Sequence, residues 1–403
     1  MRQAEPATPP PTALVLSGGG ARAAYQVGVL QSLMALRHEA LGKCTDNPFH
    51  ILCGTSAGAL NAAALACRAD NFTAAVAAIA RLWGRVHAQQ VYRTDPIGVV
   101  RGGAQWLSTL SIGWALARWR RLQPRSLLDS TPLAELLQRM VPLERLPRML
   151  RQGHLQALAI SASSYSTGEH VTFFESAHDA PGYQRSQRMA LPTRLTVPHL
   201  MASAAIPFVF PAQRLTAGTH TGWYGDGTMR QMAPISPAIH LGAQRVLVIG
   251  VGRMQEPPGR LPPNVDYPPL AQIGGHALSS IFLDGLAVDV ERMERINRTL
   301  ALLTPEQRLA TPLRPVQAMV ISPSERIDEI AARHQKALPA AVRILLRGIG
   351  ASSASTDLRG AALASYLLFE APFTCALMEL GRRDTLARGD EVKAFFGWGD
   401  SAG

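Results

Sequence analysis

Lysine is almost absent from this 403-residue sequence, although the chain is strongly basic. Only Lys43, Lys336 and Lys393 are present, so arginine supplies almost all of the formal net charge of +11. No Lys/Arg run with interleaved aromatic residues occurs, which argues against a nucleic-acid-binding segment. Two explanations of the charge stay open: a compositional preference for arginine, and an anionic partner such as a lipid surface.

Cysteine and long apolar runs are also scarce. The four cysteines, Cys44, Cys53, Cys67 and Cys375, show neither C-x-x-C spacing nor a dense disulfide framework. The first residues, MRQAEPATPPPT, lack the charged start and apolar stretch of a signal peptide, and no uninterrupted run of about 20 apolar residues exists. We therefore expect a reducing, cytoplasmic location, a flexible tail over residues 1–11, and no signal peptide or transmembrane helix.

The small share of charged residues, in contrast, excludes a disordered chain. Only 17% of the residues are charged and 47% are hydrophobic, which is typical of a globular protein with a sizeable core. Strand-like and helix-like segments alternate as TALVLS, ARAAYQVGVLQSLMAL, FHILC and AGALNAAALACR, and this alternation predicts a parallel α/β sheet. We expect an α/β region over residues 12–255 with an Arg- and Trp-rich helical insertion at 84–150, followed by a helical region over 256–403.

Two patterns further along extend this prediction. LQALAISASSYSTGEHVTFFE predicts two strands around a turn at Thr167 and Gly168, and AQRVLVIGVG predicts another buried strand. In IFLDGLAVDVERMERINRTL, apolar residues at helical spacing predict a helix with one buried face. These residues are Phe282, Leu286, Val290, Met293 and Leu300.

The segment CGTSAGAL carries a candidate nucleophile. It places Gly54, Ser56 and Gly58 in a G-x-S-x-G pattern between an apolar strand and an Ala-rich helix. A sharp strand-to-helix turn lifts such a serine above the sheet, and small neighbours admit a substrate. The N-terminus of the following helix also favours negative charge at the reacting centre. A plain turn with a capping serine would fit the pattern alone, but the strand-turn-helix context favours a nucleophile.

A glycine-rich segment, LSGGGARA, follows the first predicted strand. Its backbone N–H groups are unobstructed by side chains and can hold a phosphate or an oxyanion. Gly18, Gly20 and Ala23 also fit the G-x-G-x-x-G/A fingerprint of dinucleotide-binding proteins. That kind of site requires an acidic residue near the end of the second strand, where this sequence has Ser56. We therefore favour an oxyanion-binding loop over residues 18–22.

A nucleophilic serine needs a base within hydrogen-bond reach, and Asp226 is the candidate. It stands between Gly225 and Gly227 in WYGDGTMRQMAPISPAI, after a predicted strand. A lone Asp-Gly pair is usually only a turn. The candidate gains support from the Ala-rich segment HLMASAAIPFVFPA that comes just before it.

The ordered set GGGARA, GTSAG, ASAAIPFVFPA and DGT resembles the patatin-like phospholipases, from residue 12 to about 252. The resemblance implies a three-layer α/β/α fold with a mostly parallel central sheet and a helical C-terminal region. It also implies a lipid acyl hydrolase with a Ser-Asp dyad, a lipid-ester substrate, and no metal or organic cofactor. Carried over by residue, it implies Ser56 as nucleophile and Asp226 as base. The other residues it implies are Gly18, Gly19, Gly20 and Arg22 for the oxyanion hole, and Gly54, Gly58 and Gly227 for the motif turns.

Two positions depart from the family pattern. Ala23 replaces the last glycine of the first motif, and Thr228 follows Asp226 and Gly227 where glycine or alanine is usual. An alanine in a left-handed conformation would cost about 1–2 kcal/mol, whereas one that packs the helix on the strand is acceptable, and we expect the second case. Because an ordinary aspartate, with a pKa near 3.9, is a weak base at neutral pH, the loop and helix must stabilise negative charge strongly.

Two alternative functions stay open. A Ser-His-acid esterase could use His240 downstream, although in that fold several strands come before the strand that leads to the serine, and only one does here. The other alternative is a non-catalytic protein that binds an anionic membrane surface. It rests on residues 101–121, RGGAQWLSTLSIGWALARWRR, whose apolar residues are flanked by arginines. A subdomain helix packed on the core would explain that segment equally well.

Overall fold

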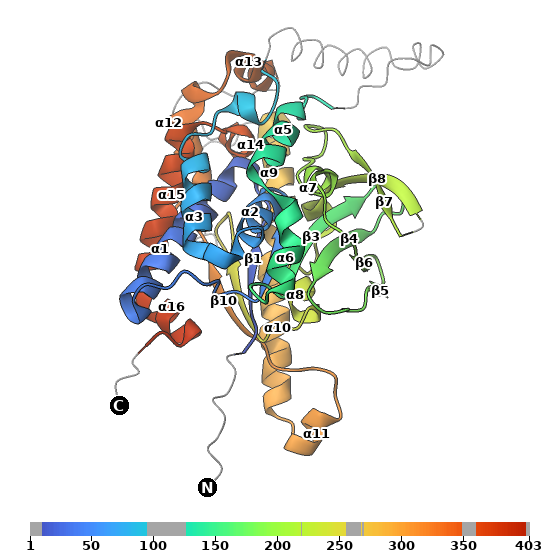
Figure 1. Ribbon diagram of the computed structural model, residues 1–403. Helices are drawn as coiled ribbons and strands as arrows, with labels where there is room; N and C mark the ends of the chain where they lie inside the picture. Colours follow the sequence, from blue (N-terminus) through green and yellow to red (C-terminus); the bar gives the residue numbers. More distant parts are fainter. Residues whose placement is uncertain are drawn as a thin grey trace.

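The computed structural model describes residues 10–94, 126–218, 220–254, 267, 270–348 and 360–399. Ten strands form one mixed sheet with helices on both faces (Figure 1). The strand order is β10-β9-β1-β2-β3-β4-β6-β5, and β8 pairs with both β3 and β7. The strands are β1 (Thr12–Leu16), β2 (Ile51–Thr55), β3 (Ala157–Ser164), β4 (His170–Ser176), β5 (Tyr183–Arg185), β6 (Arg188–Pro192), β7 (Gln213–Ala217), β8 (His220–Asp226), β9 (Arg245–Ile249) and β10 (Gln317–Ile321).

Helices occupy most of the rest of the described chain. Those up to residue 240 are α1 (Ala24–Leu41), α2 (Ala57–Ala66), α3 (Phe72–Trp83), α5 (Thr131–Met140), α6 (Leu146–Arg151), α7 (Val197–Ser203) and α8 (Ser236–His240). The later ones are α9 (Leu270–Ser279), α10 (Gly285–Ala301), α11 (Pro305–Leu309), α12 (Ile327–His334), α13 (Ala340–Gly348), α14 (Ala361–Leu367), α15 (Ala371–Leu386) and α16 (Gly389–Phe396).

The centre of the sheet is parallel, as the alternation of strands and helices predicts. β10, β9, β1, β2 and β3 all run in the same direction. β3 and β4 pair antiparallel around the predicted turn, where Gly168 has a φ of 72°. α5 and α6 fall within the predicted helical insertion, of which residues 95–125 lie outside the described residues.

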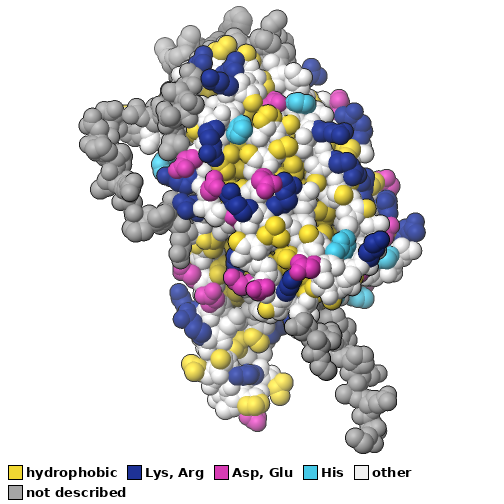
Figure 2. All heavy atoms as spheres, turned by 90° about the vertical axis from the view of Figure 1, so that its left-hand side faces the viewer, with side chains coloured by type: hydrophobic (Ala, Val, Ile, Leu, Met, Phe, Trp, Pro, Cys, Tyr) yellow, Lys and Arg dark blue, Asp and Glu magenta, His cyan; other side chains and the backbone are white. Residues whose placement is uncertain are grey.

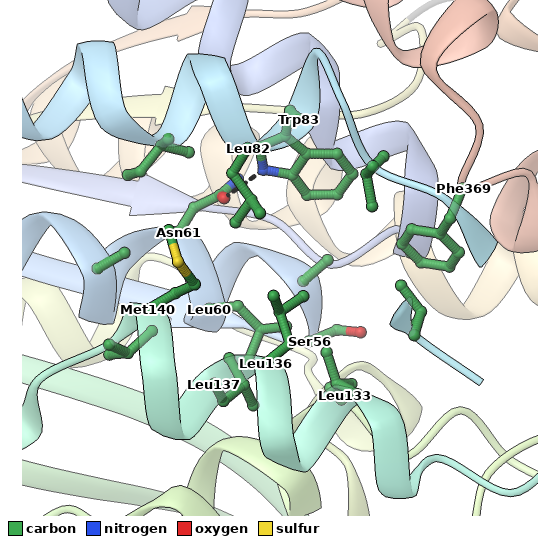
Figure 3. Close-up of a pocket in the computed structure, with 18 of the residues that line it drawn as sticks. Ser56, Leu60, Asn61, Leu82, Trp83, Leu133, Leu136, Leu137, Met140 and Phe369 are labelled. Carbon is green, nitrogen blue, oxygen red and sulfur yellow. Dashed lines mark hydrogen bonds between the residues drawn. The ribbon is translucent and has the colours of Figure 1, made fainter. Parts of the chain in front are cut away.

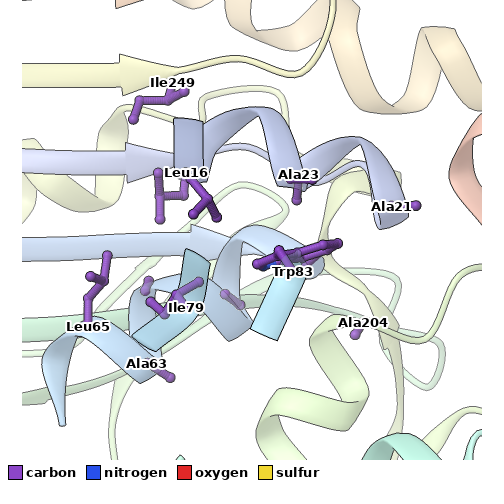
Figure 4. Close-up of a cluster of buried hydrophobic side chains, with 14 of the residues drawn as sticks. Leu16, Ala21, Ala23, Ala63, Leu65, Ile79, Trp83, Ala204 and Ile249 are labelled. Carbon is purple, nitrogen blue, oxygen red and sulfur yellow. The ribbon is translucent and has the colours of Figure 1, made fainter. Parts of the chain in front are cut away.

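Alternating residues of the central strands pack into two separate cores. In β1, Leu14 and Leu16 belong to one buried cluster, whereas Ala13 and Val15 belong to another. Because successive side chains of a strand point to opposite faces, these clusters lie on the two sides of the sheet. Figure 4 shows part of the first core, in which α2 and α3 pack over the strands; α8 and α10 contribute to the second. The result is the α/β/α layering that the resemblance implies.

The region after residue 256 adds a strand as well as helices. β10 pairs in parallel with β9 and extends the central sheet, which the sequence analysis did not anticipate. α15 packs closely on α1: a Cβ on Gly28 would lie 1.9 Å from the Met378 carbonyl oxygen, and one on Gly381 would lie 2.3 Å from the Tyr25 carbonyl oxygen. Only glycines permit this approach of two helix backbones. The regions before and after residue 255 therefore share one sheet. The division of the chain into domains at residue 255 stays a prediction.

A long helix runs from Leu270 to Ala301 through α9, a π-helical turn at Ser280–Asp284, and α10. Its predicted apolar face is confirmed, since Phe282, Leu286 and Met293 are buried. By length and composition this helix could cross a membrane, and two bent helix pairs, α2 with α3 and α14 with α15, pass the same test when each pair is taken as one span. The lack of an uninterrupted apolar run of about 20 residues predicts no such helix, and this criterion misses a helix whose apolar residues alternate with polar ones.

Positively charged side chains are spread over the face that Figure 2 shows and form no single patch there. On this face, which carries α1, α12 and α15, basic and acidic side chains are interspersed with apolar ones. Several arginines there pair with acids, for example Arg388 with Glu391 at 2.7 Å. The candidate membrane-binding segment, residues 101–121, lies outside the described residues.

Candidate active site

Ser56 lies at a sharp turn between β2 and α2. Its φ of 54° and ψ of −131° are sparsely populated for a residue with a side chain, and such strain is concentrated at functional sites. Two glycines permit the turn: a Cβ on Gly54 would lie 2.5 Å from the Gly58 carbonyl oxygen, and one on Gly58 would lie 2.3 Å from the Leu16 carbonyl oxygen. The G-x-S-x-G segment therefore forms the predicted strand-turn-helix and brings α2 close to β1.

Ser56 and Asp226 form a buried pair. The Ser56 hydroxyl donates a hydrogen bond to Oδ2 of Asp226 at 2.6 Å, and both residues are almost completely shielded from solvent. Asp226 ends β8, which pairs with β3, and β3 pairs with β2. A Cβ on Gly227 would lie 2.3 Å from the Ser161 carbonyl oxygen, so glycine lets the chain turn against β3. Sheet pairing thus joins two residues that are 170 positions apart.

The other carboxylate oxygen of Asp226 is held by Thr228. Oδ1 accepts hydrogen bonds from the Thr228 N–H at 3.0 Å and from its hydroxyl at 2.7 Å. Burial raises the pKa of Asp226 to about 6, and the hydrogen bonds from Ser56 and Thr228 oppose this rise because they favour the ionised form. From the sequence alone, an aspartate of ordinary basicity is expected. Burial makes this one a stronger base that is still largely ionised at neutral pH.

The glycine-rich loop passes beside Ser56. A Cβ on Gly18 would lie 2.9 Å from the Ser56 Cβ. Gly20 has a φ of 54°, and a Cβ there would lie 2.3 Å from the Tyr366 carbonyl oxygen, so both backbone conformation and space require glycine. Among the described residues, the N–H groups of Gly18, Gly19 and Gly20 have no hydrogen-bond acceptor. They stay candidates for the oxyanion hole that the sequence predicts.

Arg22 connects this loop to the C-terminal helices. Its buried guanidinium donates to Asp328 Oδ1 at 2.5 Å and to Ser365 Oγ at 2.7 Å, and it lies 4.1 Å from the centre of the Tyr366 ring. The side chain is therefore committed to α12 and α14, and the Arg22 N–H donates to the Gly19 carbonyl oxygen at 3.1 Å, so the role of Arg22 in the oxyanion hole stays a prediction without an unpaired backbone donor. Ala23 is fully buried with a right-handed φ of −65°, so alanine is unstrained there, as expected.

Ser203, at the end of α7, is a contact of Ser56 that the sequence analysis missed. Its hydroxyl accepts a hydrogen bond from the Ser56 N–H at 2.9 Å and donates one to the Ser161 carbonyl oxygen at 2.6 Å. It lies within ASAAIPFVFPA, a segment that resembles a family motif but that by itself implies no role for the serine. No spacing rule links this position to Ser56, because the contact depends on how α7 packs on the sheet.

No described histidine hydrogen-bonds to Ser56 or Asp226. His240, the base of the esterase alternative, shares a hydrogen bond with the Pro181 carbonyl oxygen at 2.9 Å and packs on the ring of Tyr183. Over the ranges that the structure describes, no group of three or more His, Cys, Asp or Glu residues is arranged to hold a metal ion. The geometry therefore favours a direct Ser-Asp pair over a Ser-His-acid triad.

A largely apolar cavity extends from Ser56 between α2, α3 and α5 (Figure 3). The space open to the centre of a water-sized sphere amounts to about 80 Å³, so the cavity is narrow. Figure 3 shows Ser56 between Phe369 on one side and Met140 on the other. Most of the lining is hydrocarbon from Ala, Leu, Ile and Val side chains. The cavity can therefore accept an apolar chain whose reactive end meets Ser56.

Comparison with known proteins agrees with this geometry. The family model of the patatin-like phospholipases matches residues 14–239, which is more than half of the chain and includes Ser56 and Asp226. No curated protein matches significantly. Among solved structures, VipD from Legionella pneumophila is similar over 92% of this chain and 67% of that chain, with 12% identity and a TM-score of 0.33, a likeness too weak to support an inference. On the family match, the chain belongs to the patatin-like phospholipases.

Proposed function

We propose that this protein is a serine hydrolase that cleaves carboxylic esters of lipids through a Ser56-Asp226 dyad and an acyl-enzyme. Membership of the patatin-like phospholipases supports a lipid acyl hydrolase in general. The observation that carries the finer proposal is the buried hydrogen bond of 2.6 Å between the Ser56 hydroxyl and Asp226, at one side of an apolar cavity. A nucleophile in direct contact with its base, next to space for an alkyl chain, suits acyl transfer from a lipid ester.

In the first step, Asp226 Oδ2 accepts the hydroxyl proton as Ser56 Oγ attacks the ester carbonyl carbon. The raised pKa of Asp226, about 6, makes it a better proton acceptor than an ordinary aspartate. The tetrahedral intermediate then collapses, its bond to the alcohol oxygen breaks, and the alcohol leaves with the proton that Asp226 holds. Ser56 is left acylated.

Negative charge on the carbonyl oxygen needs donors during this step. The N–H groups of Gly18, Gly19 and Gly20 have no acceptor within the described chain, and the loop that carries them passes beside Ser56 at Gly18. The N-terminus of α2, which begins directly after Ser56, adds partial positive charge. Removal of one such donor typically costs about 10²- to 10³-fold in kcat, so this loop is a substantial part of the proposed mechanism.

In the hydrolysis of the acyl-enzyme, water is the nucleophile and Ser56 is the leaving group. Asp226 accepts a proton from water, the resulting hydroxide attacks the acyl carbon, and Ser56 leaves with that proton. The products are a fatty acid and the free enzyme. No metal or organic cofactor takes part in the proposed reaction.

The test is fatty-acid release from mixed phospholipid vesicles and hydrolysis of a short p-nitrophenyl ester. We expect Ser56→Ala and Asp226→Asn each to lower kcat by at least about 10⁴-fold while the circular dichroism spectrum stays unchanged. The matched control is Asp289→Asn, since Asp289 is also buried but binds the Ile235 N–H at 2.9 Å. An Asp226→Asn variant with normal turnover would overturn the dyad. If His240→Ala then abolished activity, the Ser-His-acid alternative would replace it.

Peripheral association with an anionic membrane surface, from a cytoplasmic location, is a second part of the proposal. The net charge of +11 supports it. Sedimentation of Ser56→Ala with anionic and with neutral vesicles tests it without turnover. Binding to the anionic vesicles alone, weakened by salt, is the expected result. A wild type that binds but cleaves none of these lipids would favour the non-catalytic alternative.

A further inference from the structure

One face of α2 lines the cavity along the whole length of the helix. The contributing residues are Ser56, Ala57, Leu60, Asn61, Ala64 and Arg68. Their spacing of three or four positions places them in a single stripe. The cavity therefore runs parallel to α2 and does not merely surround Ser56.

The ends of this stripe set the length of the cavity along α2, which we call the channel. Ser56 precedes the first residue of α2, and Arg68 follows its last turn. At a rise of 1.5 Å per residue, twelve positions correspond to about 18 Å. An extended alkyl chain with carbon-carbon bonds of about 1.5 Å advances about 1.25 Å per carbon because it zigzags. About 14 carbons would therefore reach from Ser56 to Arg68.

The walls between these ends present carbon to the channel. The polar groups of Asn61 are already paired: its oxygen accepts from Trp83 Nε1 at 2.9 Å, and its amide nitrogen donates to Gln26 Oε1 at 3.0 Å. Figure 3 shows the Asn61–Trp83 bond together with Leu133, which lies near Ser56 on the opposite wall. Leu136, Leu137 and Met140 continue that wall along α5, so no unpaired polar group interrupts it.

The end of the channel remote from Ser56 is charged. Arg68, Ala75 and Ala78 line both the apolar cavity and a second, surface pocket. That second pocket also contains Arg81 and the Arg145–Asp70 ion pair, whose atoms are 2.7 Å apart. An alkyl chain that extended past Arg68 would have to displace water from these charged groups, which is unfavourable. The lining of the channel therefore changes from apolar to charged at Arg68.

We propose that the channel along α2 binds the acyl chain of the ester and limits it to about 12 to 14 carbons, with Arg68 at the methyl end. The inference rests on the proposed function, because the acyl carbonyl must lie at Ser56. Each methylene inside the channel adds binding up to about fourfold, and each one beyond Arg68 adds none. Energy from this remote binding holds the carbonyl against Ser56.

The test is kcat/KM for p-nitrophenyl esters with acyl chains of 4, 8, 12, 14 and 18 carbons, at constant mole fraction in detergent micelles. We expect a rise of at least about tenfold from the 4-carbon to the 12-carbon ester and a fall at 18 carbons. Ala64→Phe fills the middle of the channel, and it should lower the ratio of 12-carbon to 4-carbon activity at least about tenfold. Gln138→Ala, on the exposed side of α5, is the control and should keep the wild-type ratio.

Arg68 gives a pair of variants with opposite expectations. Arg68→Leu makes the end apolar and should raise the ratio of 18-carbon to 12-carbon activity at least about fivefold. Arg68→Lys keeps the charge and should keep the fall at 18 carbons. Equal effects of both variants would overturn the role of charge at this end.

Displacement of a fluorescent fatty acid from the Ser56→Ala variant separates this inference from the proposed function. An optimum near 12 to 14 carbons that Ala64→Phe abolishes supports the channel even if the wild type cleaves no ester. A wild type that cleaves the 4-carbon ester but shows no dependence on chain length retains the proposed function and overturns the channel. Normal unfolding temperatures for the variants exclude misfolding as the cause.

Discussion

The contacts of Asp226 determine the pH range in which Ser56 can react. Because the base must be ionised, we expect kcat/KM to fall as pH drops through about 6, the pKa of Asp226. Thr228→Val keeps the shape of the side chain but removes the hydroxyl that donates to Oδ1 at 2.7 Å. Loss of a hydrogen bond to the ionised form raises the pKa. The acid limb of the profile should therefore move to higher pH, by about one unit.

Thr228→Ser restores the hydroxyl and is the control for this change. It should return the acid limb to the wild-type position, whereas loss of packing alone would affect kcat equally at all pH values. An unchanged limb in Thr228→Val would contradict a direct influence of Thr228 on Asp226. Burial and the charge of Asp226 raise the pKa of Tyr165, so this side chain stays neutral over this range.

The same burial predicts a stability difference that depends on pH. The folded state holds a proton on Asp226 up to about pH 6, whereas the unfolded chain releases it near pH 3.8. Below pH 3.8 the two states bind equal numbers of protons, and stability is lost as pH rises through the folded pKa. Asp226→Asn removes this titration. Its free energy of unfolding relative to wild type should rise by about 2.5 kcal/mol between pH 4 and pH 7.5.

Urea unfolding of both proteins at several pH values measures this difference, and all other titrations cancel when the two are subtracted. A constant difference across the range would show that Asp226 has an ordinary pKa in the folded state. Sequence reasoning identified Asp226 only through its order among family motifs. Its basicity could not be predicted, because it depends on burial beneath elements that are distant in the chain.

Ser203 links three elements: α7, β3 and the turn at Ser56. Its hydroxyl joins α7 to the Ser56 N–H and to the carbonyl of Ser161 in β3. Ser203→Ala leaves both buried groups without a partner, at about 1–3 kcal/mol for each. We expect a lower free energy of unfolding in urea and a reduced kcat with little change in KM for a short ester, because the turn at Ser56 loses its support.

Ser32→Ala is a suitable comparison for that change. Ser32 is buried in α1, and its hydroxyl donates to the Arg382 carbonyl oxygen at 3.2 Å. This substitution should lower stability without lowering kcat. Equal loss of kcat in the two variants would mean that Ser203 acts only through general stability.

The elements differ in how far the sequence could predict them. β1, β2 and α2 follow from short local patterns of apolar residues and glycines, and the turn at Ser56 follows from Gly54 and Gly58. β10 could not be predicted from its five residues, because a short strand is identified mainly by the neighbour it pairs with. The contact of Ser203 with Ser56 depends in the same way on packing between distant segments.

The C-terminal region of the chain supports the loop beside Ser56, although the two are far apart in the sequence. β10 pairs with β9, and the carbonyl of Tyr366 approaches Gly20 so closely that a side chain there is excluded. Arg22 then ties the loop to α12 and α14. The family motifs end before this region, so no sequence pattern connects it with the site. The geometry makes it part of the framework that orients the glycine N–H groups.

Asp328→Asn tests that connection. Arg22 is 2% exposed, and its ion pair with Asp328 at 2.5 Å is the one that neutralises it in the described part of the chain. Leaving a buried charge unpaired is strongly destabilising, although the partial exposure of Asp328 reduces the effect to about 2 kcal/mol. We expect a lower free energy of unfolding in urea and a lower kcat for a short ester, because the loop shifts. Glu325→Gln, which breaks an exposed pair with Arg383, should cost less than about 1 kcal/mol and leave kcat unchanged. If both variants lost the same stability and kept full activity, the C-terminal region would be only an extension of the core, and Gly18 to Gly20 would hold their conformation without it.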